Sequence, residues 1–387
     1  MQENLKSNQE SINLNNEIIR KKAANKKMKI LNFIFIIAVF TGLAIYMIYI
    51  DGMDNIIELL HSVDYKWVLA GVGCLLVHWL CDSLNLYIPI KRMYPTQTFK
   101  NSFKVAMIGQ LFNNITPFAT GGQPMQAYYL VKFGVPLGCG ITALLSRFIV
   151  YQFVLTGYSI FTLAVGYKHF GDDLQQKGLM PFVLIGFIIN TAVIVALIAI
   201  ALFRKGTLKF ANWLISLLTR MHIVKRPIKW RVYFTREVNK FYNNFKYLKK
   251  NIPLLLKSVF FTFIQLTLFL SISYVLYRGF GLEGTSLLQI ISYQAYVLMI
   301  SSFIPLPGAM GGAELGYHGF FKDIFGEHYV NTAMMLWRIM TFYLPIIVGL
   351  FFTLTMKNKG IEEPQDGETE KMLYDMEQQT ENDPEIK

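Results

Sequence analysis

The chain has 387 residues, of which 53% are apolar and only 16% are charged, and its mean hydropathy is +0.37. Soluble domains carry roughly a quarter charged residues, so this composition excludes an ordinary soluble enzyme and indicates a membrane protein. The net charge of +12 is explained by basic loops beside membrane spans rather than by nucleic-acid binding. The three cysteines form no CxxC pair, so neither a disulfide framework nor a metal site is predicted, and no cofactor is expected.

Long apolar runs predict an all-α polytopic fold with six membrane-spanning helices. Each run has about the 20 residues that a hydrocarbon core of roughly 30 Å requires. The predicted spans are residues 29–50, 66–90, 141–166, 180–203, 253–278 and 331–356.

The distribution of lysine and arginine predicts the orientation of these spans. Basic residues crowd the N-terminal tail, the link 91–104 and the segment 204–257, which has fourteen Lys and Arg against the single acid Glu237. The positive-inside rule places these segments in the cytoplasm, and six crossings return the C-terminus to the same side. We therefore expect a bacterial plasma-membrane protein with both termini cytoplasmic.

The sequence divides into a membrane domain, residues 29–356, and three polar regions. Residues 1–28 form a basic tail, and residues 204–252 form a cytoplasmic loop within the membrane domain. Within that loop, residues 208–219 are apolar on one side and too short to span, which favours an interfacial helix. Residues 357–387 form an acidic tail, with ten acids against two lysines after position 360, and are predicted to be disordered.

Two further apolar regions, 103–133 and 286–325, are interrupted by proline and glycine. Proline removes a backbone donor and glycine loosens a helix, so each region is predicted to break into two half-helices. Counting sides of the membrane, the first region enters and leaves from the cytoplasm and the second from outside. The sequence thus predicts two re-entrant helical hairpins of opposite direction.

The two broken regions match each other in register. Pro117-x-x-x-Gly121-Gly122 corresponds to Pro307-x-x-x-Gly311-Gly312, and a Lys follows ten residues beyond the second glycine in both copies. Thr142 and Thr332 both lie 25 residues after the matched proline. Inverted repeats with discontinuous helices are typical of alternating-access transporters, whose site lies between the repeats. The alternative is that proline and glycine merely kink ordinary helices.

The predicted half-helices provide a candidate anion site. Their N-termini would point into the membrane interior, where free N–H groups and the helix dipole favour a phosphate. The polar side chains that could donate hydrogen bonds beside it are Asn113, Asn114, Thr116, Gln123 and Gln126.

Five charged or titratable positions in the predicted membrane domain are candidates for function. Arg147 and Arg338 either snorkel to the surface or clamp a phosphate, for which a guanidinium is suited. Glu314 either caps the second half-helix or binds a cationic group or a proton. His78 and Asp82, one turn apart, form either a structural pair or a proton relay.

The segments Asn114-x-x-Pro117-x-x-x-Gly121-Gly122-Gln123 and Pro305-Leu306-Pro307-Gly308-x-x-Gly311-Gly312-x-Glu314, with the later Arg338, resemble the lysylphosphatidylglycerol synthase transmembrane (flippase) family. The resemblance covers about residues 30–356, and Gln123 stands where an acid is often found in the family. It implies a free-standing membrane module without the cytoplasmic synthase domain. From these motifs together with the polar and charged positions above, the candidate head-group residues are Asn114, Thr116, Pro117, Gly121, Gly122, Gln123, Arg147, Pro307, Gly308, Gly311, Gly312, Glu314 and Arg338.

The expected function is transport of an anionic or aminoacylated phospholipid such as lysyl-phosphatidylglycerol, with resistance to cationic antimicrobial peptides as its implied consequence. A phospholipid and possibly a separate synthase are the expected partners, and no nucleic acid is expected. Two alternatives stay open. The chain could be the membrane part of a phosphatidylglycerol lysyltransferase, or a docking partner of such a synthase. No P-loop, HExxH or GxSxG motif is present, and no catalytic residue is assigned.

Overall fold

The computed structural model describes residues 63–176, 178, 180–220 and 251–355, together with single residues and pairs between 228 and 250. These residues form helices and connecting turns and contain no strand, so the predicted all-α fold is confirmed for this part of the chain. The predicted first span 29–50, the N-terminal tail and the acidic tail lie outside the described residues.

Four segments within the described part are long and apolar enough to cross a membrane: Tyr65–Met93, Leu137–Ala164, Ile252–Gly279 and Pro307–Thr355. The shorter apolar helices are Met180–Ala196 and Leu287–Ser301. The multi-pass character of the protein is therefore supported, while the total of six spans and the two re-entrant hairpins stay predictions.

The first half of the described chain begins with a long helix, α3 (Tyr65–Met93), which starts where the Asp64 side chain accepts a hydrogen bond from the Lys66 N–H at 2.9 Å. After it come α4 (Phe99–Ile115), the short 3-10 turn η1 (Pro117–Ala119), α5 (Gly122–Lys132) and α6 (Leu137–Gln176). Thr98 caps α4 by accepting from the Asn101 N–H. Acceptors of this kind satisfy N–H groups that the helix itself leaves unpaired.

The second half repeats this order after two further helices. Helix α7 (Met180–Leu202) leads into α8 (Arg204–Arg220), which includes the predicted interfacial segment. Then follow α10 (Ile252–Gly279), α11 (Leu287–Ser301), the 3-10 turn η2 (Pro307–Ala309) and α12 (Gly312–Arg338). A π-helical turn, η3 (Ile339–Tyr343), and α13 (Leu344–Thr355) complete it.

The predicted span 331–356 does not correspond to one continuous helix in the structure. Helix α12 begins at Gly312 and contains a break at Gly326, where φ is 74° and ψ is 164°. Helical structure resumes at residue 327, four residues before the predicted start of the span at 331. Residues 327–331 contain no proline or glycine that would interrupt the helix. The π-helical turn then separates Arg338 from α13.

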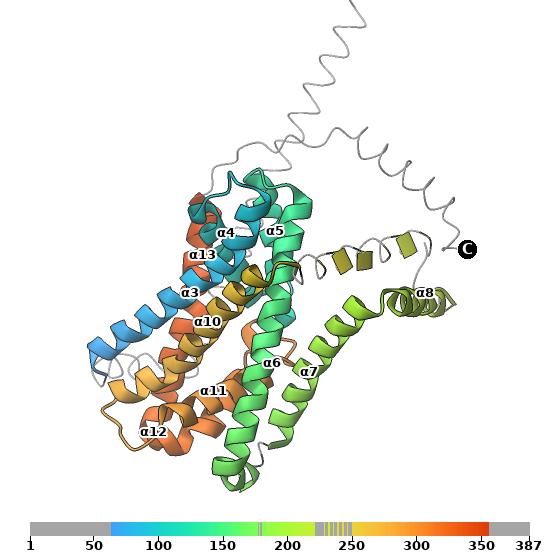
Figure 1. Ribbon diagram of the computed structural model, residues 1–387. Helices are drawn as coiled ribbons and strands as arrows, with labels where there is room; N and C mark the ends of the chain where they lie inside the picture. Colours follow the sequence, from blue (N-terminus) through green and yellow to red (C-terminus); the bar gives the residue numbers. More distant parts are fainter. Residues whose placement is uncertain are drawn as a thin grey trace, which may run out of the picture. The chain divides into compact units, whose positions relative to one another are not determined.

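The long helices α3 and α10 pack along each other (Figure 1). Helix α13 packs on α4, and here Gly349 allows close approach, because a Cβ at this position would lie 2.5 Å from the Met107 carbonyl oxygen. Helix α7 approaches α11 in the same way at Gly186. Small residues at such contacts are the usual means by which membrane helices come together.

Candidate functional site

The two broken regions meet each other in the fold. The turns η1 and η2, which we call the elbows, are in contact although they lie nearly two hundred residues apart in the chain. Both have left-handed backbone at matched positions: Phe118 and Gly308 have φ of 52° and 59°, and Ala119 and Ala309 both have φ of 53°. Left-handed backbone is unfavourable for residues other than glycine and persists only where the surroundings enforce it.

The start of α5 is held by side chains from the end of α4. Thr116 Oγ1 accepts a hydrogen bond from the Gly121 N–H at 2.8 Å, and Asn113 Oδ1 accepts from the Gly122 N–H at 3.1 Å. A Cβ at position 122 would lie 2.1 Å from Asn113 Oδ1, so any residue other than glycine would displace this side chain from its capping position. Two of the N–H groups that the sequence suggested for an anion are therefore already paired.

The start of α12 carries its own carboxylate. Glu314 accepts a hydrogen bond from the Gly311 N–H through Oε2 at 2.7 Å, and its Oε1 lies 2.6 Å from Arg338 Nε. Glu314 thus caps the helix and pairs with the arginine at the same time. The negative charge that a helix N-terminus favours is here supplied by the protein itself.

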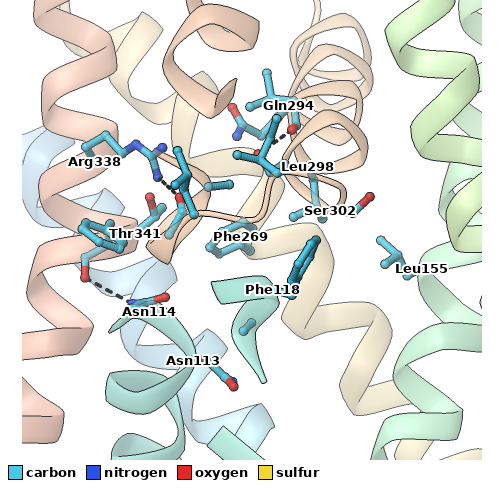
Figure 2. Close-up of a pocket in the computed structure, with 18 of the residues that line it drawn as sticks. Asn113, Asn114, Phe118, Leu155, Phe269, Gln294, Leu298, Ser302, Arg338 and Thr341 are labelled. Atoms are coloured by element: carbon cyan, nitrogen blue, oxygen red, sulfur yellow. Dashed lines mark hydrogen bonds between the residues drawn. The ribbon is translucent and has the colours of Figure 1, made fainter. Parts of the chain in front are cut away.

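Arg338 is buried, with an exposed fraction of 8%, and is held from several sides. Its Nη1 donates to the Gly308 carbonyl oxygen of η2 at 3.1 Å, and its guanidinium lies over the rings of Trp337 and Phe342, 4.8 and 5.5 Å from their centroids. Figure 2 shows the contact with the elbow. The remaining nitrogen, Nη2, is buried and has no hydrogen-bond partner in the structure, as is also true of the Trp337 indole N–H.

Arg147 forms a second ion pair with Asp82 of α3. Its Nη2 lies 2.8 Å from Asp82 Oδ1 and 3.1 Å from Oδ2, while its Nη1 is buried without a hydrogen-bond partner. The side chain of Asp82 is 1% exposed and also accepts from Gln265 Nε2 at 3.1 Å and from Gln110 Nε2 at 3.3 Å. A buried carboxylate needs such partners, since its desolvation is costly.

His78 is linked to Asp82 through α10. The His78 Nδ1 lies 2.9 Å from the Gln265 carbonyl oxygen, and the side-chain amide of Gln265 donates to Asp82. Both residues that the sequence suggested as a pair thus bond to Gln265, one to its backbone and the other to its side chain. A proton relay through them stays a proposal.

Each arginine lines a cavity. Arg338 faces a cavity of about 340 Å³, whose walls come from α4, α6, α7, α11 and the elbows (Figure 2). Arg147, Asp82 and His78 line a second cavity of about 320 Å³. The residues that line both cavities are Asn113, Phe118, Ala119, Tyr151, Phe269 and Leu298. The cavities therefore adjoin each other at η1.

The site residues predicted from the sequence lie in the first cavity, in the second cavity, or in the elbows and the helix starts that follow them. Asn114 lines the first cavity and donates its amide to the Phe342 carbonyl oxygen at 3.2 Å, and Gln123 and Gln126 line the second cavity. The remaining members form the elbows and the helix starts that follow them: Thr116, Pro117, Gly121, Gly122, Pro307, Gly308, Gly311 and Gly312. Sequence reasoning did not find Phe118, Trp337 and Gln265, and only the position of Trp337 next to Arg338 offered a signal.

These observations define a class of protein: a multi-pass membrane protein with matched broken helices and two adjoining cavities, each lined by an arginine. The chain belongs to the family described as "Lysylphosphatidylglycerol synthase TM region", which it matches over residues 33–349. This confirms the family that the motifs indicated.

Two relatives extend the comparison. A UPF0104 membrane protein of Methanocaldococcus jannaschii is 28% identical over 356 aligned positions, which cover 85% of this chain and 94% of the relative. An uncharacterized protein of Mycoplasma pneumoniae is 22% identical over 347 positions, which cover 83% of this chain and 87% of the relative. No solved structure matches the chain.

Proposed function

We propose that the protein is a lipid transporter that moves the head group of an anionic or aminoacylated phospholipid across the plasma membrane while the acyl chains stay in the bilayer. Both termini are proposed to face the cytoplasm. The observation that carries the proposal is the pair of adjoining cavities, each lined by one arginine that has a buried guanidinium nitrogen without a hydrogen-bond partner.

Physical reasons support a phosphate as the group that these arginines bind. A guanidinium presents several N–H donors in a plane and binds phosphate oxygens in pairs. The elbows are proposed to lie at membrane depth, where irregular backbone is tolerated only if it is buried in protein or lines a water-filled cavity. Transporters with repeated broken helices bind their substrate between the repeats. An aminoacylated phospholipid in the outer leaflet would reduce the negative charge of that leaflet, and this would account for the proposed resistance to cationic peptides.

The test is a transport assay in proteoliposomes that contain only this protein. Fluorescent phosphatidylglycerol and its lysyl ester are supplied, and chemical quenching reports how fast each crosses the bilayer. We expect transport above the rate of empty vesicles, and we expect Arg338→Ala and Glu314→Ala to abolish most of it. Arg278→Ala is the matched control, because Arg278 pairs with Glu283 at 3.0 Å but lines neither cavity.

Two results would count against the proposal in different ways. If both site variants insert, fold and transport at the wild-type rate, the head-group site is assigned wrongly. If the wild-type protein moves no phospholipid with or without a proton gradient, transport itself is wrong. Lipid extracts of cells that express only this chain test the enzyme alternative, which predicts newly made aminoacyl-lipid.

A further inference from the structure

Helix α8 has features that the proposed transport site does not use. Helix α7 ends at Leu202, Phe203 interrupts the helical structure, and α8 follows as a separate element (Figure 1). The Phe203 carbonyl oxygen closes the first turn of α8, because it accepts hydrogen bonds from the Thr207 N–H at 2.9 Å and from the Thr207 hydroxyl at 3.1 Å. The sequence predicts that α7 spans the bilayer, so α8 begins at the membrane face where α7 leaves it.

One face of α8 is apolar and open. Phe210, Trp213 and Leu217 follow each other at intervals of three and four residues, which places them on one side of the helix. Their exposed fractions are 61%, 57% and 39%, and the ring centroids of Phe210 and Trp213 lie 5.6 Å apart. The opposite side of the helix is packed, since Ile215 is only 3% exposed. The described part of the chain therefore leaves three large apolar side chains uncovered on one helix face.

A basic face adjoins this apolar face. It contains exposed side chains at helical spacing, among them Lys205, Lys209, Ser216 and Arg220. At about 100° per residue, the centre of the basic face lies roughly 80° from the centre of the apolar face around the helix axis. Arg231, from the segment that follows α8, donates to the Ser216 hydroxyl at 2.9 Å and so brings a further positive charge to the same face.

The charge and the shape of α8 together indicate what covers it. Residues 204–257 contain fourteen Lys and Arg against the single acid Glu237, so an anionic partner is favoured. Cations beside exposed Trp, Phe and Leu are typical of a helix that lies in the bilayer interface, with its apolar side chains among the acyl chains and its cations at the level of the phosphates. A nucleic acid would match the charge, but it offers no apolar layer for Leu217.

We propose that α8 is a binding surface for an anionic membrane. Phe210, Trp213 and Leu217 insert among the acyl chains, while Lys209 and Arg220 contact the anionic head groups of the same leaflet. None of these five residues lines either cavity, so the surface is distinct from the proposed transport site. The inference therefore holds whether or not the protein transports lipid.

The fluorescence of Trp213 in the reconstituted full-length protein tests the proposal. The Trp213 signal is the difference between the wild type and Trp213→Phe, measured in vesicles of phosphatidylcholine alone and in vesicles that also contain phosphatidylglycerol. Phosphatidylcholine brominated in its acyl chains quenches rings inside the bilayer, and acrylamide quenches rings in water. We expect phosphatidylglycerol to increase quenching by the brominated lipid and to reduce quenching by acrylamide, and we expect added salt to reverse both changes.

Substitutions separate the charged contribution from the apolar one. Lys209→Gln and Arg220→Gln should each lower the ratio of docked to undocked α8 about fivefold in vesicles that contain phosphatidylglycerol, and should have no effect in phosphatidylcholine alone. Phe210→Ala should lower the ratio at least about tenfold in both kinds of vesicle, because an inserted ring is lost. Lys322→Gln is the matched control, since it removes an exposed lysine from α12 and should leave the Trp213 signal unchanged.

Three outcomes would overturn the proposal. If Trp213 stays open to acrylamide and unquenched by brominated lipid in every vesicle, α8 does not contact the membrane. If quenching is the same with and without phosphatidylglycerol and is unaffected by salt, the surface has no preference for anionic lipid. If added transfer RNA shields Trp213 from acrylamide and phosphatidylglycerol does not, the surface belongs to a nucleic acid.

Discussion

The Asp82–Arg147 ion pair allows a quantitative test of how the site is built. Two unit charges 2.8 Å apart attract each other by about 6 kcal/mol at an effective dielectric constant of about 20. Desolvation offsets most of that attraction, so the pair adds little over a neutral pair of similar shape. Removing one partner is different, because it leaves the other charge buried and unpaired. We expect Asp82→Asn and Arg147→Met each to lower the free energy of unfolding by about 3–5 kcal/mol.

The double variant Asp82→Asn/Arg147→Met tests whether the two losses of stability are coupled. Asparagine at position 82 retains partners in Gln110 and Gln265, and methionine at 147 needs none, so the double variant should lose less than either single variant. Reversible unfolding of the purified protein in mixed micelles measures all four states. The exposed Arg278–Glu283 pair is the comparison, where each change should cost less than about 1 kcal/mol. Losses at Asp82 and Arg147 that simply add would refute the reasoning, because independent sites are additive.

Three further predictions concern packing and backbone. Gly349→Ala should lower the free energy of unfolding by about 1–3 kcal/mol, because α13 must move by about 0.5 Å to relieve the Cβ contact. Gly73→Ala, with open space around the new Cβ, should instead raise it by about 0.5–1 kcal/mol. Unfolding in micelles compares the two variants. Gly311→Ala should cost about 1–3 kcal/mol although nothing blocks a Cβ there, because φ is 82°; a neutral effect would show that the turn relaxes. Phe118→Ala should open the wall between the two cavities and weaken head-group selectivity in the liposome assay, and unchanged selectivity would show that Phe118 does not separate them.

The sequence predicted much of the architecture. Within the described residues, the starts and ends of the helices for residues 66–90, 180–203 and 253–278 agree with the structure within about three residues, since long apolar runs and capping residues mark them locally. The elbows were predictable because proline and glycine act on the backbone where they stand. The two copies also match in register, and this similarity is what pointed to a repeat.

The partners inside the site were not predictable in the same way. Arg147 and Asp82 lie 65 residues apart, and Gln265 reaches them from α10, so their contact depends on how α3 packs on α10. His78 and Asp82 lie one turn apart on one helix, but each bonds to Gln265 of α10: His78 to its backbone carbonyl oxygen and Asp82 to its side-chain amide. The left-handed backbone of Phe118 carries no local signal, because large aromatic residues rarely adopt it.

The contact between η1 and η2 has a mechanical consequence. Each elbow contains strained backbone, and Arg338 ties the carbonyl of Gly308 to the same ion pair that caps α12. Because the elbows are in contact, a rotation of one would displace the other. If the protein transports lipid as proposed, opening a path on one side of the membrane and closing it on the other would be a single movement, coupled through the elbows and Arg338.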